Sequence, residues 1–216
     1  MAAVLLGGAC VVVARRLLVQ RQQLAGLVAA LEASNERTVA YAREMERQAL
    51  EDKLTGLHNR RFMDADLPRE LERTRRFGRE FTLAILDVDG FKSINDGYSH
   101  RLGDEVLTEL ADLLRQACRS MDGVVRYGGD EFVLYFPETP LATGRTICQR
   151  ILKRVSRHAW DGLAPDLEVT LSIGLVSTRD ADDVEGLLEA ADQRLREAKQ
   201  HGKNRLIGAP ALVRVA

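Results

Sequence analysis

The chain carries two hydrophobic patterns in succession, one typical of a long helix and one typical of a mixed α/β domain. Residues 20–49 hold one glycine and no proline, and apolar or small residues recur there at alternating four- and three-residue steps. The row consists of Leu24, Val28, Leu31, Asn35, Thr38, Ala42, Met45 and Ala49. This spacing is that of a coiled-coil seam, so we expect a helical linker over residues 20–51 that pairs two copies of the chain. The alternative is a single amphipathic helix lying on the domain.

From residue 52 onward, strand-like and helix-like patterns alternate. Strands are expected at residues 81–88, 124–127, 131–136, 167–177 and 204–207. Helices are expected before Gly78 and at residues 102–119, 139–158 and 183–201. The order predicts an α+β fold in which a mainly antiparallel central sheet with a ferredoxin-like core is flanked by helices, preceded by the long N-terminal helix.

The N-terminal segment is apolar from residue 2 to residue 14, and Arg15 and Arg16 follow. A helix of that run covers about 20 Å, short of a hydrocarbon core of about 30 Å, but a tilted helix with snorkelling arginines can reach further. We therefore expect residues 1–19 to anchor the chain in the inner membrane, with the domain held in the cytoplasm by the arginines. A truncated gene start or a buried apolar helix are the alternatives, and without insertion the protein is expected in the cytoplasm.

Composition excludes several classes of function. Of 216 residues, 45% are hydrophobic and 29% charged, which suits a globular core, and the net charge of −1 argues against a nucleic-acid partner. The three cysteines and four histidines show no paired spacing for zinc or a redox couple. Such sparse cysteines fit a reducing compartment.

Residues 126–132 read Arg-Tyr-Gly-Gly-Asp-Glu-Phe between two predicted strands. The two glycines permit the positive φ angles of a tight hairpin turn, and two acids follow at once on the returning strand. Asp87 ends the first core strand, and that strand can neighbour the hairpin in a split βαβ fold. Asp87 and Asp130 would then meet at one sheet edge, where two carboxylates suit Mg²⁺. Strand termination or helix capping is the alternative for Asp87, and we expect Asp89 to support the turn.

Three segments together resemble the GGDEF family, the diguanylate cyclases. They are residues 52–62 (DKLTGLHNRRF), residues 87–96 (DVDGFKSIND) and the hairpin, and the likeness extends over about residues 52–207. The resemblance implies a palm- or cyclase-like domain over residues 52–210, followed by a tail at 211–216. It implies that two GTP molecules are condensed into cyclic di-GMP by a homodimer that uses Mg²⁺, with Mn²⁺ as the alternative ion.

The resemblance also implies a role for individual residues. Those implied to bind the metal are Asp87, Val88 and Asp130. Those implied in catalysis are Glu131, Asp130 and Lys92. Those implied to bind substrate are Gly90, Phe91, Lys92, Asn95, Asp104, Gly128, Gly129, Lys199 and Lys203. Asn95 and Asp104 correspond to the guanine-reading pair, because a carboxylate accepts the two N–H donors that adenine lacks.

Several of these roles have a plain alternative. Glu131 is either the base for the 3′-hydroxyl or a second-sphere metal ligand. Asp104 is able to cap a helix beginning near Glu105, and the two lysines are able to lie at a solvated helix end.

Arg119 and Asp122 form an R-x-x-D segment ahead of the hairpin, which the resemblance implies to be an inhibitory site for the product. The chain departs from the family pattern at Ser99, Arg194 and Arg196, none of which is a metal, base or guanine-reading position. A catalytically silent module that binds cyclic di-GMP or GTP, and a structural membrane adaptor, are the rival hypotheses.

Overall fold

The computed structural model describes residues 2–208, without the side chains of residues 2–14, 17–19 and 43. The chain divides after residue 48 into two compact units. The expected C-terminal tail, residues 211–216, lies outside the described residues, as do most side chains of the expected membrane anchor. Within the described part of the chain, no helix combines the length and the apolar character that a membrane crossing requires. The membrane anchor stays a prediction, because most of its side chains lie outside the described residues.

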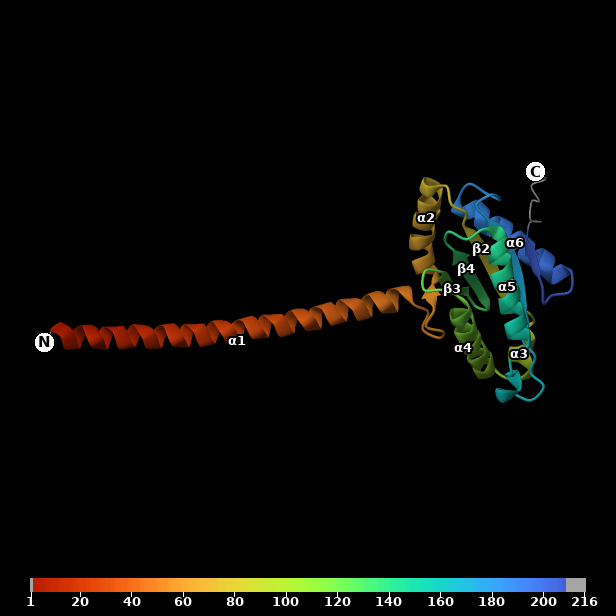
Figure 1. Cartoon of the computed structure of the whole chain (residues 1–216). Helices are drawn as coiled ribbons and strands as arrows, with labels where there is room; N and C mark the ends of the chain where they lie inside the picture. Colours follow the sequence, from red (N-terminus) through yellow and green to blue (C-terminus); the bar gives the residue numbers. More distant parts are fainter. Residues whose placement is uncertain (1, 209–216) are drawn as a thin grey trace. The chain divides into compact units, whose positions relative to one another are not determined.

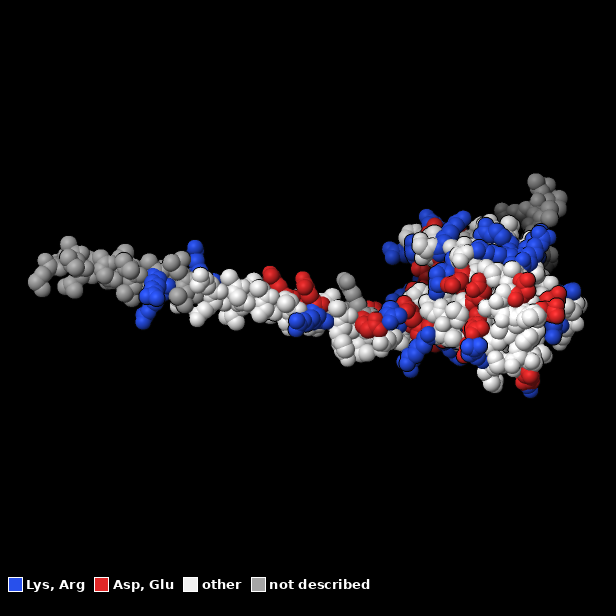
Figure 2. Space-filling model, turned by 90° about the horizontal axis from the view of Figure 1, so that it is seen from below, with Lys and Arg blue, Asp and Glu red and all other residues white. Residues whose placement is uncertain are grey.

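Residues 2–48 of helix α1 form the first unit, and the whole helix, Ala2–Leu50, is longer than the linker expected from the seam (Figure 1). Large apolar side chains along it are exposed, among them Leu24 at 63%, Leu31 at 71% and Met45 at 44%. Figure 2 shows that the charged side chains of the described part of α1 stand at only a few positions on the visible side. The helix thus presents unpaired apolar surface along the row that the sequence analysis singled out.

The second unit is built on one six-stranded sheet with the order β1-β3-β4-β2-β5-β6. The strands are β1 His58–Asn59, β2 Thr82–Val88, β3 Gly123–Gly128, β4 Glu131–Phe136, β5 Leu171–Ser177 and β6 Leu206–Gly208. The three central pairings are antiparallel, whereas β1 with β3 and β5 with β6 are parallel. The expected α+β fold is therefore confirmed, with the addition that the edges make the sheet mixed.

Two helix layers cover the sheet (Figure 1). The helices are α2 Arg60–Phe77, α3 Phe91–Gly97, α4 His100–Ala117, α5 Leu141–Ser156 and α6 Val184–Gln200, with a short 3₁₀ turn at Trp160–Gly162. One buried cluster joins apolar residues of α4 and α5 to one sheet face, and a second joins those of α2 and α6 to the other. Strand β2 is buried on both faces because it lies between the two layers.

The alternation of side chains along β2 decides where its last carboxylate points. Leu83 and Ile85 pack in the cluster with α2 and α6, whereas Ala84 and Leu86 pack in the cluster with α4 and α5. Because successive strand residues face opposite sides, Asp87 falls on the α2 and α6 face, at the end of the strand.

Some element boundaries differ from the expected ones. Ser99 caps α4, since its Oγ accepts the Leu102 N–H at 3.2 Å, so the helix begins at His100. The alternative that Asp104 caps this helix is therefore wrong, because Asp104 lies in its second turn. Strand β5 begins at Leu171, four residues later than expected, and the two-residue strand β1 was not expected.

Arg194, one of the departures from the family pattern, fastens α6 to the loop after β5. Its Nη1 donates to the Leu175 carbonyl and its Nη2 to Asp180 Oδ1, each at 2.6 Å. Asp180 Oδ2 also accepts the Ser177 N–H at 2.8 Å. Burial alone raises the pKa of Asp180, but the hydrogen bonds from Arg194 and Ser177 outweigh it and hold the pKa below its usual value.

Arg194→Ala is expected to lower the free energy of unfolding at pH 7 by about 2 kcal/mol, because the Asp180 carboxylate loses a charged partner. Both side chains of the pair are less than one fifth exposed, at 19% and 15%. The deficit is expected to be complete above pH of about 4, the ordinary carboxyl pKa, and to shrink as the pH falls through the lower folded-state pKa. Urea unfolding at several pH values measures it.

Arg196→Ala is the matched control, because Arg196 pairs with Asp192 on the exposed side of the same helix. A loss of only about 0.5 kcal/mol is expected there. Equal losses in the two variants at pH 7 would contradict the role given to Arg194.

Candidate active site

Three carboxylates converge where β2 ends and β4 begins. Asp87 is the cross-strand partner of Glu131, and the Val88 N–H donates to the Asp130 carbonyl at 3.3 Å. Because paired residues of neighbouring strands share a face, the Asp87 and Glu131 side chains lie on the same side of the sheet. Asp87 is 6% exposed, and the two acids of the hairpin are partly buried. The register thus brings Asp87 and the hairpin acids to one sheet edge.

Lys199, near the end of α6, reaches into this carboxylate group. Its Nζ lies 2.7 Å from Asp87 Oδ2, and its side chain is 39% exposed. Burial raises the pKa of Asp87 to about 6, while Lys199 works in the opposite direction and the charges of Asp130 and Glu131 add to the rise. The effect of burial on Asp87 thus outweighs that of the contact with Lys199.

The donor set at this edge fits a hard divalent cation. Carboxylate and carbonyl oxygens are what Mg²⁺ prefers, and proteins hold it through one or two carboxylates while water and phosphate supply the rest. In the described residues, no group of three or more His, Cys, Asp or Glu side chains is arranged to hold an ion by itself. The arrangement therefore suits an ion that arrives with a phosphate ligand better than a closed structural metal site.

The hairpin turn is held from behind by Arg126. Gly129 has a φ of 55°, and its carbonyl accepts from Arg126 Nε at 3.0 Å and from Nη2 at 2.8 Å. Of the two glycines expected at positive φ, Gly128 does not adopt it, because it ends β3 opposite Glu131 after an irregularity in the strand register. Both glycines are exposed, so the turn leaves room for a ligand to approach the backbone.

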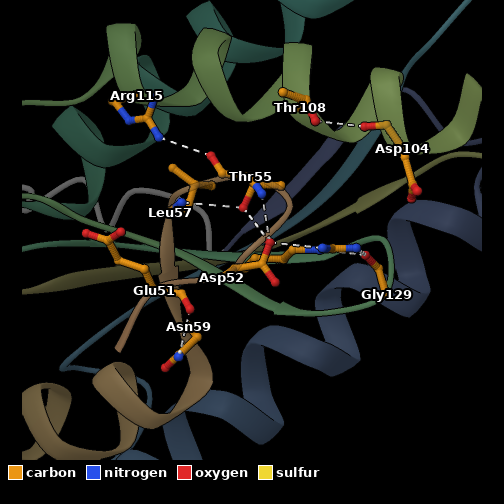
Figure 3. Close-up of polar contacts among 10 residues, drawn as sticks. Glu51, Asp52, Thr55, Leu57, Asn59, Asp104, Thr108, Arg115 and Gly129 are labelled. Atoms are coloured by element: carbon orange, nitrogen blue, oxygen red, sulfur yellow. Dashed lines mark hydrogen bonds and ion pairs between the residues drawn. The ribbon is translucent and has the colours of Figure 1, made fainter. Parts of the chain in front are cut away.

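Asp52 in the segment that enters the domain and Gly129 of the turn, both labelled in Figure 3, are linked through Arg126. Arg126 Nη1 donates to Asp52 Oδ1 at 2.9 Å, and the same oxygen accepts from the Thr55 N–H at 3.0 Å and from Thr55 Oγ1 at 2.7 Å. Burial alone raises the pKa of Asp52, but these hydrogen bonds outweigh it and lower the pKa. The sequence analysis assigned no role to these residues, although an arginine directly before the hairpin and an acid at the domain entry were the available signal.

The expected guanine-reading residues lie on two adjoining helices. Asn95 belongs to α3, and its Oδ1 is buried without a hydrogen-bond partner. A Cβ at Gly103 would lie 2.0 Å from that oxygen, so the absence of a side chain lets Asn95 rest against α4 one residue before Asp104. Asp104 is exposed and projects from α4 (Figure 3). Leaving a buried acceptor without a hydrogen bond is costly. Asn95 Oδ1 is therefore a candidate to accept a hydrogen bond from a ligand.

The residues expected to contact phosphates lie on three segments: the turn from β2 into α3, the end of α6, and the loop between α6 and β6. Gly90, with a φ of 73°, turns the chain from β2 into α3, and Lys92 is exposed in the first turn of that helix. Phe91 is partly buried beside it. Lys203 is exposed in the loop between α6 and β6. The fold thus places Lys92, Lys199 and Lys203 on segments that meet near the end of β2.

Arg119 and Asp122 lie apart from this edge. The Arg119 N–H donates to Asp122 Oδ2 at 2.7 Å, and the Asp122 N–H donates to the Arg119 carbonyl at 3.1 Å, which closes a tight turn. This turn precedes the start of β3, whereas the hairpin follows its end. The Arg119 side chain is exposed. The segment is therefore separate from the carboxylates by the length of a strand.

The mixed sheet flanked by two helix layers is a fold of the palm- or cyclase-like class. Residues 49–205 match the family described as "Diguanylate cyclase, GGDEF domain". This match extends over more than half of the chain, so the chain belongs to the GGDEF family.

The chain is 40% identical over 166 residues to the response regulator PleD of Caulobacter vibrioides. The matched region covers 76% of this chain and 37% of the relative. It is 36% identical over 167 residues to the diguanylate cyclase DgcP of Pseudomonas aeruginosa, which covers 77% of this chain and 25% of the relative. The chain thus spans well under half the length of these curated relatives.

Among solved structures, the coiled coil and GGDEF domain of DgcB from Caulobacter crescentus, in complex with c-di-GMP, matches with a TM-score of 0.78 and 29% identity. The match covers 86% of this chain and 99% of that chain. Diguanylate cyclase SiaD in complex with its activator SiaC, from Pseudomonas aeruginosa, matches with a TM-score of 0.70 and 30% identity, over 91% of this chain and 76% of that one. The likeness to DgcB includes a coiled-coil segment besides the domain.

Proposed function

We propose that this chain is a diguanylate cyclase that converts two GTP into cyclic di-GMP and two pyrophosphates. The observation that carries the proposal is the convergence of Asp87, Asp130 and Glu131 at one sheet edge, with Lys199 2.7 Å from Asp87. The family match and the relatives named as diguanylate cyclases support it.

In the proposed reaction, the 3′-hydroxyl oxygen of each GTP forms a bond to the α-phosphorus of the other. The bond between that phosphorus and the α–β bridging oxygen breaks, and pyrophosphate leaves with the electron pair. Glu131 accepts the hydroxyl proton, and Lys92, Lys199 and Lys203 offset the charge of the phosphates. Asp87, Asp130 and the Val88 carbonyl would hold a Mg²⁺ ion, which would supply Lewis-acid polarisation of the phosphate oxygens.

Base selection is assigned to Asn95 and Asp104. The Asp104 carboxylate suits the N1–H and N2–H donors of guanine, and the unpartnered Asn95 Oδ1 offers a further acceptor. Adenine presents no such pair of donors, so GTP rather than ATP is the proposed substrate.

The reaction needs two domains that face each other, because one domain presents one GTP to one acceptor hydroxyl. We assign their pairing to α1, whose exposed apolar row at coiled-coil spacing is suited to a second copy of the chain. The homodimer holds two domains at high local concentration.

Incubation of the purified full chain with GTP and Mg²⁺, followed by chromatographic separation of the nucleotides, tests the proposal. Cyclic di-GMP and pyrophosphate in a 1:2 ratio are expected, and none from Glu131→Gln under the same conditions. If a confirmed dimer binds GTP but leaves it unchanged, the cyclase hypothesis would be wrong and the chain would be a silent binding module.

We further propose that the Arg119–Asp122 turn binds the product and inhibits the enzyme, because an exposed arginine offers bidentate contacts to phosphate or to the guanine edge. Arg119→Ala is expected to raise the concentration of cyclic di-GMP needed for half inhibition at least about tenfold, the loss of one charged hydrogen-bonded contact. Initial rates with added cyclic di-GMP measure this concentration. Arg157→Ala, an exposed arginine on another helix end, is the control; an unaltered inhibition curve for Arg119→Ala would remove the regulatory claim.

A further inference from the structure

Asp89 lies two residues after Asp87 and bonds to two segments that are distant in sequence. Its Oδ2 accepts from Thr170 Oγ1 at 2.7 Å and from the Asn204 N–H at 2.9 Å, and its Oδ1 accepts from Ser172 Oγ at 2.6 Å. Its own N–H donates to the Thr170 carbonyl at 2.9 Å. One carboxylate thus joins the turn before α3, the start of β5 and the loop that leads into β6.

The loop that receives this bond is conformationally demanding. Lys203 and Asn204 have φ angles of 60° and 45°, in the left-handed region that non-glycine residues rarely adopt. Such conformations persist only where surrounding contacts fix them. The Lys203 N–H donates to the Ala198 carbonyl at 3.1 Å, and the next N–H, that of Asn204, goes to Asp89. The Asp89 carboxylate therefore fixes the backbone on one side of Lys203.

Each of the two segments that Asp89 joins carries an exposed lysine, Lys92 and Lys203. Asp89 precedes Gly90 and Lys92 directly in the chain, and Asn204 follows Lys203 directly. The hydroxyl of Ser172 in β5 and that of Thr170, directly before β5, hold the carboxylate in place, and Ser172 is fully buried. The carboxylate thus sets the distance between the turn at Gly90 and the Lys203 backbone.

We propose that Asp89 is a positioning residue that holds Lys203 toward the β- and γ-phosphates of a bound nucleoside triphosphate. The inference rests on the proposed function, because it concerns the same nucleotide. Asp89 does not touch the substrate in this proposal; it acts through the loop. Its loss should weaken recognition of the terminal phosphates and leave recognition of the base and first phosphate intact.

The test compares two probes by calorimetry in the presence of Mg²⁺: GMP, and α,β-methylene-GTP, in which the bond broken by the reaction is replaced by a stable one. Asp89→Asn is expected to weaken binding of the triphosphate analogue about tenfold, the loss typical of one charged contact, and to leave GMP binding unchanged. Lys203→Ala is expected to show the same selective loss. The double variant should be no weaker than Lys203→Ala alone, because the two residues act in series.

Ser172→Ala is the matched control, since it removes one donor to Asp89 but leaves the bond to Asn204, and a smaller loss is expected. Asp89→Ser keeps one acceptor oxygen and is measured alongside, with thermal melting of each variant, so that poor folding of one substitution does not decide the result. An equal loss for GMP and the analogue, an unchanged analogue affinity, or fully additive losses in the double variant would each overturn the inference. Wild-type protein that binds neither probe would overturn the proposed function first.

Discussion

Asp87→Asn is expected to reduce cyclase activity by at least about 1,000-fold. The substitution removes a buried charge that faces Glu131 across the sheet and contacts Lys199. Charge stabilisation by a bound metal is worth several kcal/mol, and each 1.36 kcal/mol is a factor of ten in rate. The initial rate of pyrophosphate release at saturating GTP and Mg²⁺ measures the loss.

The same substitution is not expected to unfold the domain. Asparagine has nearly the shape of aspartate, and burial disfavours the ionised carboxylate enough to raise the pKa of Asp87 to about 6. At neutral pH the wild-type fold therefore bears the cost of a desolvated charge that the variant lacks. The midpoint of urea unfolding for Asp87→Asn should equal or exceed the wild-type value.

Asp96→Asn is the matched control for this substitution, because Asp96 is an exposed acid on α3 with no assigned role. It should retain near wild-type activity. A stable, folded Asp87→Asn variant with more than about a tenth of wild-type activity would contradict the proposed chemistry, because such a loss is below that of one ordinary charged contact.

The sequence predicts the site well where one local pattern fixes both the element and the residue. Strand β2 contains the unbroken apolar run 83–86, so its end, and with it Asp87, was placed correctly at the edge of the sheet. The hairpin was placed correctly for the same reason, because glycines between two apolar strands leave few other solutions. The order of these strands then followed from the split βαβ pattern, which makes β2 and β4 neighbours.

Contacts between distant segments are what the sequence does not reveal. The bond from Arg126 to Asp52 joins residues 74 positions apart, and the bond from Asn204 to Asp89 joins residues 115 apart. No local sequence pattern predicts either of these two hydrogen bonds. Strand β1 has two residues and exists only because β3 offers it a parallel edge. Lys199 was expected to meet a triphosphate, and its contact with Asp87 depends on how α6 packs, which no local pattern encodes.

Leu31→Glu in helix α1 is expected to lower cyclase activity about 100-fold at low micromolar protein. The reason is that linking two domains through paired helices raises their effective concentration by two to four orders of magnitude. Leu31 is 71% exposed on α1 and belongs to the proposed seam, where a carboxylate in each copy would face the other. Sedimentation velocity should show monomers, and the affinity of one domain for α,β-methylene-GTP should not change. Higher protein concentration should restore part of the activity.

Ala33→Glu adds the same charge two residues further along α1, outside the row of apolar seam positions, and serves as the control. It should leave both the dimer and the activity intact. This pair of variants distinguishes the contribution of α1 from that of the nucleotide site, since every residue proposed to touch nucleotide lies beyond residue 86. A Leu31→Glu protein that is monomeric and still fully active would show that two domains meet without the helix, and the assignment of dimerisation to α1 would be wrong.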